Sequence, residues 1–62
     1  MLAAGDIVRS VGDSWSEKYL DKIFLVIEFV ETNEFGKKWI VLDHISGGTL
    51  IIYEDEVEKV AA

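Results

Sequence analysis

Hydrophobic and β-branched residues occur along this chain in short runs separated by turn residues, and this pattern predicts strands rather than helices. The clearest case is the segment 39–53, in which two such runs flank the Ser-Gly-Gly sequence at residues 46–48. Glycines in a short connection between two strand-like runs are typical of a β-hairpin. We therefore expect residues 37–43 and 48–53 to pair as antiparallel strands.

The same pattern predicts three further strands. A Gly-Asp pair at residues 5 and 6 opens a short alternating strand, and the longest run is rich in β-branched and aromatic residues. We expect a long polar loop at residues 12–21, a turn at 32–36 and a single tight turn at 54–56. The predicted fold is therefore all-β, with five strands at residues 5–11, 22–32, 37–43, 48–53 and 57–60.

The longest predicted strand is apolar on both of its faces. One face carries four large hydrophobic residues, and the other combines hydrophobic residues with Lys22 and Glu28. A half-exposed antiparallel sheet should alternate hydrophobic and polar residues more cleanly. Either the sheet curls into a barrel whose long strand serves two packing layers, or another molecule covers one apolar face. We take the barrel as the main prediction and expect a core formed by Ile7, Leu25, Ile27, Val41 and Leu50.

The chain has 62 residues, which predicts one domain over residues 1–62 with a thin core. It contains no cysteine, so disulfides and thiolate metal sites are excluded, and a reducing compartment is the simplest setting. We find no signal-peptide pattern, and the longest apolar run, residues 23–27, is too short to cross a bilayer. We therefore expect a cytoplasmic protein.

The charge balance is acidic, with 12 carboxylates against 6 lysines and arginines. Nucleic acids and anionic membranes attract cationic surfaces, so we expect neither direct nucleic-acid binding nor membrane binding. The carboxylates gather at residues 28–34 and 54–58. We interpret these clusters as solvated edges that discourage aggregation of strands. The alternative is that they imitate nucleic-acid phosphates and block a nucleic-acid-binding protein.

Catalysis is not expected from this sequence. The single histidine, His44, lies beside Asp43 and close to Ser46, a set that would suit a general base and a nucleophile. No pattern supplies an oxyanion hole, and neighbouring residues in a turn do not point in controlled directions. His44 and Asp43 also lack further ligands for a metal. We therefore expect a solvated turn, no metal and no cofactor.

The order of the predicted elements resembles the five-stranded Src-homology-3-type barrel from Gly5 to Val60. The opening Gly-Asp-Ile-Val-Arg and the ending Glu-Asp-Glu-Val-Glu-Lys-Val look like the short barrel proteins of tailed bacteriophages, most of which have no assigned activity. Trp39 and Tyr53 lie close to where the peptide-binding signalling members carry a Trp and a Tyr. The chain lacks their Ala-Leu-Tyr-Asp-Tyr and Pro-Ser-Asn-Tyr segments. The resemblance implies a small antiparallel barrel.

Four aromatic residues are the candidate partner-binding site, because aromatic residues dominate interface hot spots. Trp15 is the most suggestive, since it lies between serines in a polar loop. We expect the aromatic residues to converge in a barrel of this type and acidic residues to surround them, which favours a basic partner. The predicted site comprises Trp15, Tyr19, Trp39 and Tyr53, with Asp13, Glu17 and Glu54 at its edge.

These observations predict a small acidic, non-catalytic protein-interaction module, with a phage accessory protein as one form of it. Two alternatives stay open. The first is an assembly protein whose apolar face closes a homodimer or larger homo-oligomer. The second is the acidic inhibitor that imitates DNA. The partner in the main hypothesis is a protein, and the acidic charge favours a basic one.

Overall fold

Five antiparallel strands form one open sheet in the computed structural model, which describes residues 2–13, 15–43 and 45–61. The predicted tight turn is a single turn of 3-10 helix between the last two strands. Each strand end lies within two residues of its predicted position, so the five strands and this turn are confirmed. The elements are β1 (Ile7–Ser10), β2 (Ile23–Asn33), β3 (Gly36–Asp43), β4 (Thr49–Tyr53), η1 (Glu54–Glu56) and β5 (Val57–Ala61).

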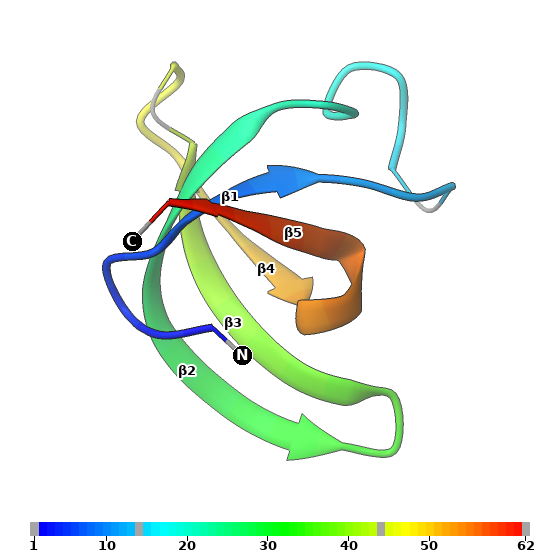
Figure 1. Ribbon diagram of the computed structural model, residues 1–62, viewed down its shortest axis with the longest axis vertical. Helices are drawn as coiled ribbons and strands as arrows, with labels where there is room; N and C mark the ends of the chain where they lie inside the picture. Colours follow the sequence, from blue (N-terminus) through cyan, green and yellow to red (C-terminus); the bar gives the residue numbers. More distant parts are fainter. Residues whose placement is uncertain (1, 14, 44, 62) are drawn as a thin grey trace.

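The strands are ordered β4-β3-β2-β1-β5, and the long strands β2 and β3 bend the sheet around one core (Figure 1). The register of β2 on β3 shifts between Val26 and Glu28 and again between Phe29 and Glu31. Such bulges increase the local bend of a strand. Among the described residues β4 and β5 are the two edges of the sheet. The predicted Src-homology-3-type barrel is therefore not confirmed, because the sheet is not closed.

The core lies on the inner side of the bent sheet. Val8, Phe24 and Val41 are at most 1% exposed, and the register places Val8 opposite Phe24 on neighbouring strands. Trp15, Tyr19 and Leu50 are partly buried and pack against this cluster. The buried hydrophobic residues are Leu2, Val8, Phe24, Val26, Trp39, Val41, Ile52 and Val57.

The predicted core was correct at Val41 and wrong on β2. Leu25 and Ile27 are 38% and 39% exposed, whereas Phe24 and Val26 on the opposite face are 1% exposed. Both faces of β2 are apolar, so the alternation of residues within this strand could not select the inner one. The choice depends on distant segments, because Trp15 stacks on the ring of Phe24. Ile7 and Leu50, the other predicted core residues, are half-buried.

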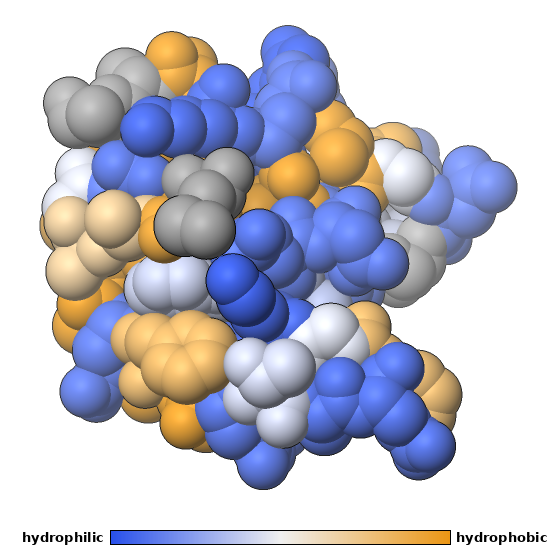
Figure 2. Space-filling view, turned by 60° about the horizontal axis from the view of Figure 1, so that its bottom comes forward, coloured by the Kyte–Doolittle hydropathy of each residue, from blue (hydrophilic) through white to orange (hydrophobic). Residues whose placement is uncertain are grey.

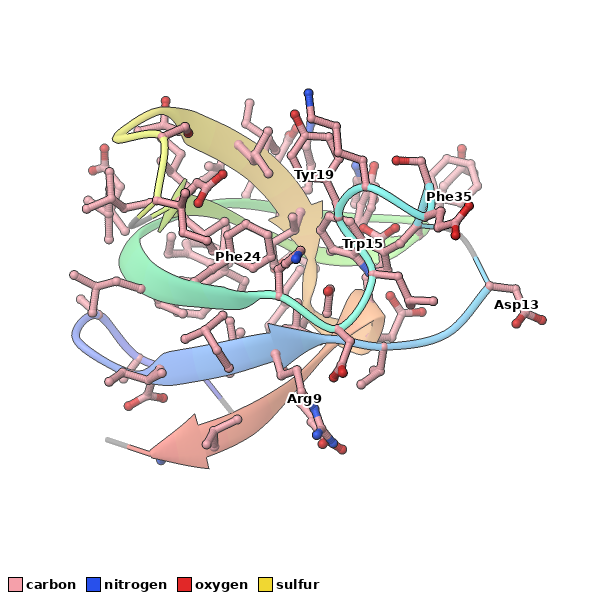
Figure 3. All side chains as sticks on the ribbon, turned by 90° about the horizontal axis from the view of Figure 1, so that it is seen from above. Arg9, Asp13, Trp15, Tyr19, Phe24 and Phe35 are labelled. Atoms are coloured by element: carbon pink, nitrogen blue, oxygen red, sulfur yellow. The ribbon has the colours of Figure 1, made fainter. Side chains whose placement is uncertain are left out.

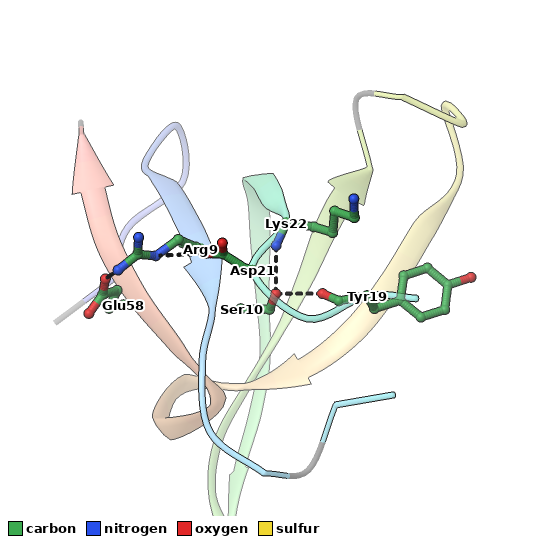
Figure 4. Close-up of polar contacts among 6 residues, drawn as sticks. All are labelled: Arg9, Ser10, Tyr19, Asp21, Lys22 and Glu58. Atoms are coloured by element: carbon green, nitrogen blue, oxygen red, sulfur yellow. Dashed lines mark hydrogen bonds and ion pairs between the residues drawn. The ribbon is translucent and has the colours of Figure 1, made fainter. Parts of the chain in front are cut away.

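A buried serine fixes the two ends of the long loop that follows β1. Ser10 is 1% exposed; its hydroxyl donates to the carbonyl of Tyr19 (2.5 Å) and accepts from the backbone N–H of Lys22 (2.9 Å; Figure 4). Asp21 completes the return of the chain in the left-handed region at φ 60°. Its backbone N–H donates to the carbonyl of Ser10 (3.3 Å). These bonds tie the end of the loop back to the end of β1.

The hairpin between β2 and β3 places an aromatic side chain at its tip. The side-chain carbonyl of Asn33 accepts a hydrogen bond from the backbone N–H of Phe35 (2.8 Å), and Gly36 returns the chain with φ 122°. Glycine adopts this positive φ without steric cost. Asn33 is not among the residues with a positive φ, and its role in the turn is this side-chain hydrogen bond. Phe35 is consequently held out in solvent and is 69% exposed.

Candidate functional site

The predicted aromatic residues divide between two places. Three of them lie at η1. The indole N–H groups of Trp15 and Trp39 donate hydrogen bonds to residues of η1. The backbone N–H of Tyr53, the residue before η1, donates to the side chain of Glu56. Tyr19 lines a separate hollow of about 260 Å³ beside Lys18 and Ile45. The structure therefore brings three of the four predicted residues together and places the fourth elsewhere.

Trp15 joins the long loop to both the core and η1. Its ring stacks on Phe24, with centroids 5.7 Å apart and planes at 19°, and its indole N–H donates to the carbonyl of Glu56 (2.8 Å). Figure 3 shows Trp15 lying toward Phe24, whereas Asp13 points away from the body of the molecule. Trp15 is half-buried. Its contacts account for a tryptophan in this polar loop, because the side chain fastens the loop to the sheet.

Replacing Trp15 should therefore lower stability. We expect Trp15→Ala to reduce the free energy of unfolding by about 2 kcal/mol, since it removes an aromatic pair and a hydrogen bond. Trp15→Phe retains a ring against Phe24 and should cost about 1 kcal/mol. Urea unfolding of the two variants measures both values. Two variants as stable as the wild type would instead support a surface role for Trp15.

Trp39 and Glu54 form a second link to η1. Trp39 is 7% exposed, and its indole N–H donates to Oε1 of Glu54 (3.0 Å). The side chain of Glu56 accepts from the backbone N–H of Tyr53 (2.8 Å), which closes the turn. Two of the acidic residues at 54–58 thus have structural hydrogen bonds, and the predicted edge residue Glu54 is half-buried.

The half-buried Tyr53 and the exposed Phe35 form an aromatic pair next to η1. Their rings meet edge to face with centroids 6.2 Å apart, and the Tyr53 hydroxyl accepts from the side-chain amide of Asn33 (3.2 Å). The ammonium of Lys38 lies 6.0 Å from the centre of the Tyr53 ring. These contacts fix Tyr53 and support Phe35 from one side, while Phe35 stays 69% exposed.

Two adjacent hollows share Phe35 and Asp55 and together form a groove, which we call the acidic groove. The first, of about 430 Å³, lies between residues 11–13, Phe35, Tyr53 and η1, and the second, of about 380 Å³, lies between residues 35–37 and η1. The outline of the molecule in Figure 2 is indented on the right. The groove is lined by Val11, Gly12, Asp13, Phe35, Gly36, Lys37, Tyr53, Glu54, Asp55 and Glu56.

The acidic groove contains part of the predicted site and two residues that the sequence analysis missed. Tyr53, Asp13 and Glu54 line it, whereas the exposed Glu17 is not among its lining residues. Phe35 and Asp55 were missed. Phe35 offered the same kind of pattern as Trp15, an aromatic residue in a polar turn. Asp55 was read as one member of an acidic run, and its place in the groove depends on the folded turn.

The remaining candidate chemistry concerned His44 and possible metal ligands. His44, which the sequence analysis treated as a solvated turn residue, lies outside the described residues. Within the described parts of the chain, histidines and carboxylates do not gather in groups of three or more that could hold a metal ion. No helix in those same parts is long and apolar enough to cross a membrane.

No family model, curated protein or solved structure matches this chain. The resemblance to Src-homology-3-type barrels and to phage proteins therefore stays a prediction from the sequence.

Proposed function

We propose that this chain is a small acidic, non-catalytic protein-interaction module, and that it binds a basic segment of a partner protein in the acidic groove. The observation that carries the proposal is Phe35. This large aromatic side chain is 69% exposed, lies between two hollows and packs against Tyr53. Exposed aromatic residues beside a hollow are typical of interface hot spots.

The charges of the groove favour a cationic ligand. Asp13, Glu54, Asp55 and Glu56 line it, against one cation, Lys37, among its lining residues. Asp13 and Asp55 are exposed, and they are therefore available to meet a lysine or arginine of the partner. Complementary charges accelerate association and select among partners more than they increase affinity. An aromatic wall with an acidic edge therefore suits a segment that combines basic and apolar side chains.

The fold supports the same proposal. Five antiparallel strands follow one another with a 3-10 turn before the last, and this is the order on which the predicted resemblance to a Src-homology-3-type barrel rests. The long loop after β1, the β2–β3 hairpin and η1 surround the groove. Loops on a rigid sheet are where binding residues commonly lie. We therefore assign the domain, as part of the proposal, to small barrels of that type that recognise peptides.

A displayed library of random peptides, selected on the immobilised protein, tests this function. We expect the selected peptides to be rich in lysine and arginine and to lose affinity as the salt concentration rises. Phe35→Ala should weaken the binding of a selected peptide by about tenfold or more, because it removes the central aromatic contact. Isothermal titration calorimetry gives the dissociation constants.

A pair of charge variants separates binding in the groove from attraction to the whole acidic chain. Asp55→Lys and Glu17→Lys change the net charge equally, but Asp55 lines the groove and Glu17 does not. We expect Asp55→Lys to weaken peptide binding much more than Glu17→Lys. Equal effects of the two substitutions, or selected peptides without basic residues, would show that the acidic groove is not the binding site.

A further inference from the structure

A hollow of about 260 Å³ lies between the end of the long loop and the hairpin that joins β3 to β4. It is more enclosed than either hollow of the acidic groove, with which it shares no lining residue. We call it the basic hollow, because two lysines line it in a chain with 12 carboxylates and only 6 lysines and arginines. Its lining residues are Lys18, Tyr19, Lys22, Asp43, Ile45 and Ser46.

The wall of the basic hollow that carries the lysines is fixed to the core. The backbone N–H of Tyr19 donates to the carbonyl of Ser16 (2.9 Å), so the end of the loop makes a tight turn. The buried Ser10 then holds this segment at both the Tyr19 carbonyl and the Lys22 N–H. Figure 4 shows the side chains of Tyr19 and Lys22 extending to the side on which β3 and β4 lie. This wall is therefore held in place before any ligand binds.

The opposite wall is held by hydrogen bonds within the hairpin. The carboxylate of Asp43 accepts from the backbone N–H of Ile45 (3.0 Å) and from the hydroxyl of Ser46 (3.1 Å), through one oxygen each. The backbone N–H of Gly47 donates to the Asp43 carbonyl (2.7 Å). Asp43 therefore stabilises the turn with both of its carboxylate oxygens. Ile45 is 74% exposed and adds an apolar side chain to this wall.

The charges in the basic hollow favour an anion. Among the described residues, neither Lys18 nor Lys22 forms an ion pair, although Asp43 lines the same hollow. The ammonium of Lys18 lies 5.4 Å from the centre of the Tyr19 ring. The lining side chains carry two positive charges and one negative charge, so a monoanion balances them. A phosphate monoester is mostly a dianion at neutral pH and would leave an excess of negative charge.

The acidic clusters of the chain lie away from this hollow. Figure 1 places the β2–β3 hairpin, beside the carboxylates of residues 28–34, at the opposite end of the longest axis from the β3–β4 hairpin. That axis is 27 Å long. Exposed charges more than about 8–10 Å apart are largely screened at physiological salt. The charges that line the hollow therefore decide what it attracts, more than the net charge of −6 does.

We propose that the basic hollow binds a small carboxylate that carries an apolar group. The ammonium groups of Lys18 and Lys22 hold the carboxylate, and the Tyr19 ring and Ile45 contact the apolar group. Pockets for drug-sized ligands have volumes of about 300–1,000 Å³, so the ligand of this hollow is smaller than those. This inference concerns a different surface from the proposed function, and either can fail without the other.

Titration of the full chain with phenylacetate, followed by amide NMR shifts, tests the proposal. We expect saturable shifts at residues 18–22 and 45–47, with a dissociation constant of about 1 mM for so small a ligand. Phenylacetamide has the same shape without the charge, and acetate has the charge without the ring. Each should bind about fivefold more weakly than phenylacetate or worse, because each loses one of the two kinds of contact.

Two matched pairs of variants test whether the binding occurs in the basic hollow. Lys22→Gln and Lys59→Gln each remove one positive charge, but only Lys22 lines the hollow. Ile45→Asp and Ile51→Asp each add a carboxylate at an isoleucine that is 74% or 61% exposed, and only Ile45 lines the hollow. We expect Lys22→Gln and Ile45→Asp to weaken phenylacetate binding about fivefold, and the two control variants to change it by less than about twofold.

The amide spectrum of each variant also shows whether it is folded, and all four substituted residues are exposed. Acetate that binds as tightly as phenylacetate would show an adventitious ion only, and equally tight binding of phenylacetamide would show an apolar contact only. Either result overturns the proposal. Equal effects within both pairs of variants would also overturn it, since they would show attraction to the whole chain. So would the absence of saturable shifts, or shifts confined to the acidic groove.

Discussion

Phe24→Ala should reduce the free energy of unfolding by about 3–5 kcal/mol, the usual cost of removing a fully buried phenylalanine. Phe24 is 1% exposed, pairs with Val8 across the sheet and lies under the ring of Trp15. Its removal therefore leaves a cavity that two elements border. Native domains have a stability of about 5–15 kcal/mol, and a chain of this size belongs near the lower limit. We expect the variant to be largely unfolded at 37 °C, as thermal denaturation will show.

Leu25→Ala is the matched control, because it changes the neighbouring residue on the opposite face of the same strand. Leu25 is 38% exposed, so the substitution should cost only about 1 kcal/mol. A larger loss at Leu25 than at Phe24 would mean that the other face of β2 is the core. The sequence pattern predicts that face to be buried, so this comparison distinguishes the two interpretations directly.

Trp39→Ala should be comparably damaging, with a loss of about 3–5 kcal/mol in urea unfolding. Trp39 is 7% exposed, lies opposite Ile52 on β4 and meets the ring of Phe29 edge to face, with centroids 5.3 Å apart. It also holds η1 through Glu54. The substitution therefore loses core packing, an aromatic pair and an attachment of the turn that carries the acidic groove.

Glu54→Ala separates these contributions. It removes the acceptor of the indole N–H and leaves the packing of Trp39 intact, so it should cost no more than about 1.5 kcal/mol. Trp39→Phe retains a ring in the core and should fall between the two alanine variants. If Glu54→Ala were as destabilising as Trp39→Ala, the hydrogen bond rather than the packing would dominate at this position.

The sequence predicted the elements better than it predicted their assembly. Strands and turns depend on local chemistry, such as the Ser-Gly-Gly connection at residues 46–48 and the β-branched run in β2, and the sequence contains this information directly. The inner face of β2 depends on contacts with β1 and with Trp15, which are distant in the chain. Because Leu25 and Phe24 are both large and apolar, alternation alone could not choose between them.

The candidate site shows the same limit. Tyr53, Asp13 and Glu54 were predicted and line the acidic groove. A tryptophan in a polar loop predicts binding by Trp15, yet its ring and its indole N–H both have partners within the chain. Phe35 is the more exposed aromatic residue, and its position at a hairpin tip follows from the register of β2 on β3. Exposure is a property of the folded sheet, and residue type does not report it.

The pairing of β1 with β5 has a consequence for how the chain folds during its synthesis. Val8 lies opposite Lys59, and Ser10 lies opposite Val57, so the first strand made is completed by the last. Pairings between residues so distant in sequence close large loops and are slow to form. The edge of β1 that pairs with β5 therefore stays unpaired until the last strand of the sheet reaches it. Folding of this sheet is completed only after residues 57–61 have emerged.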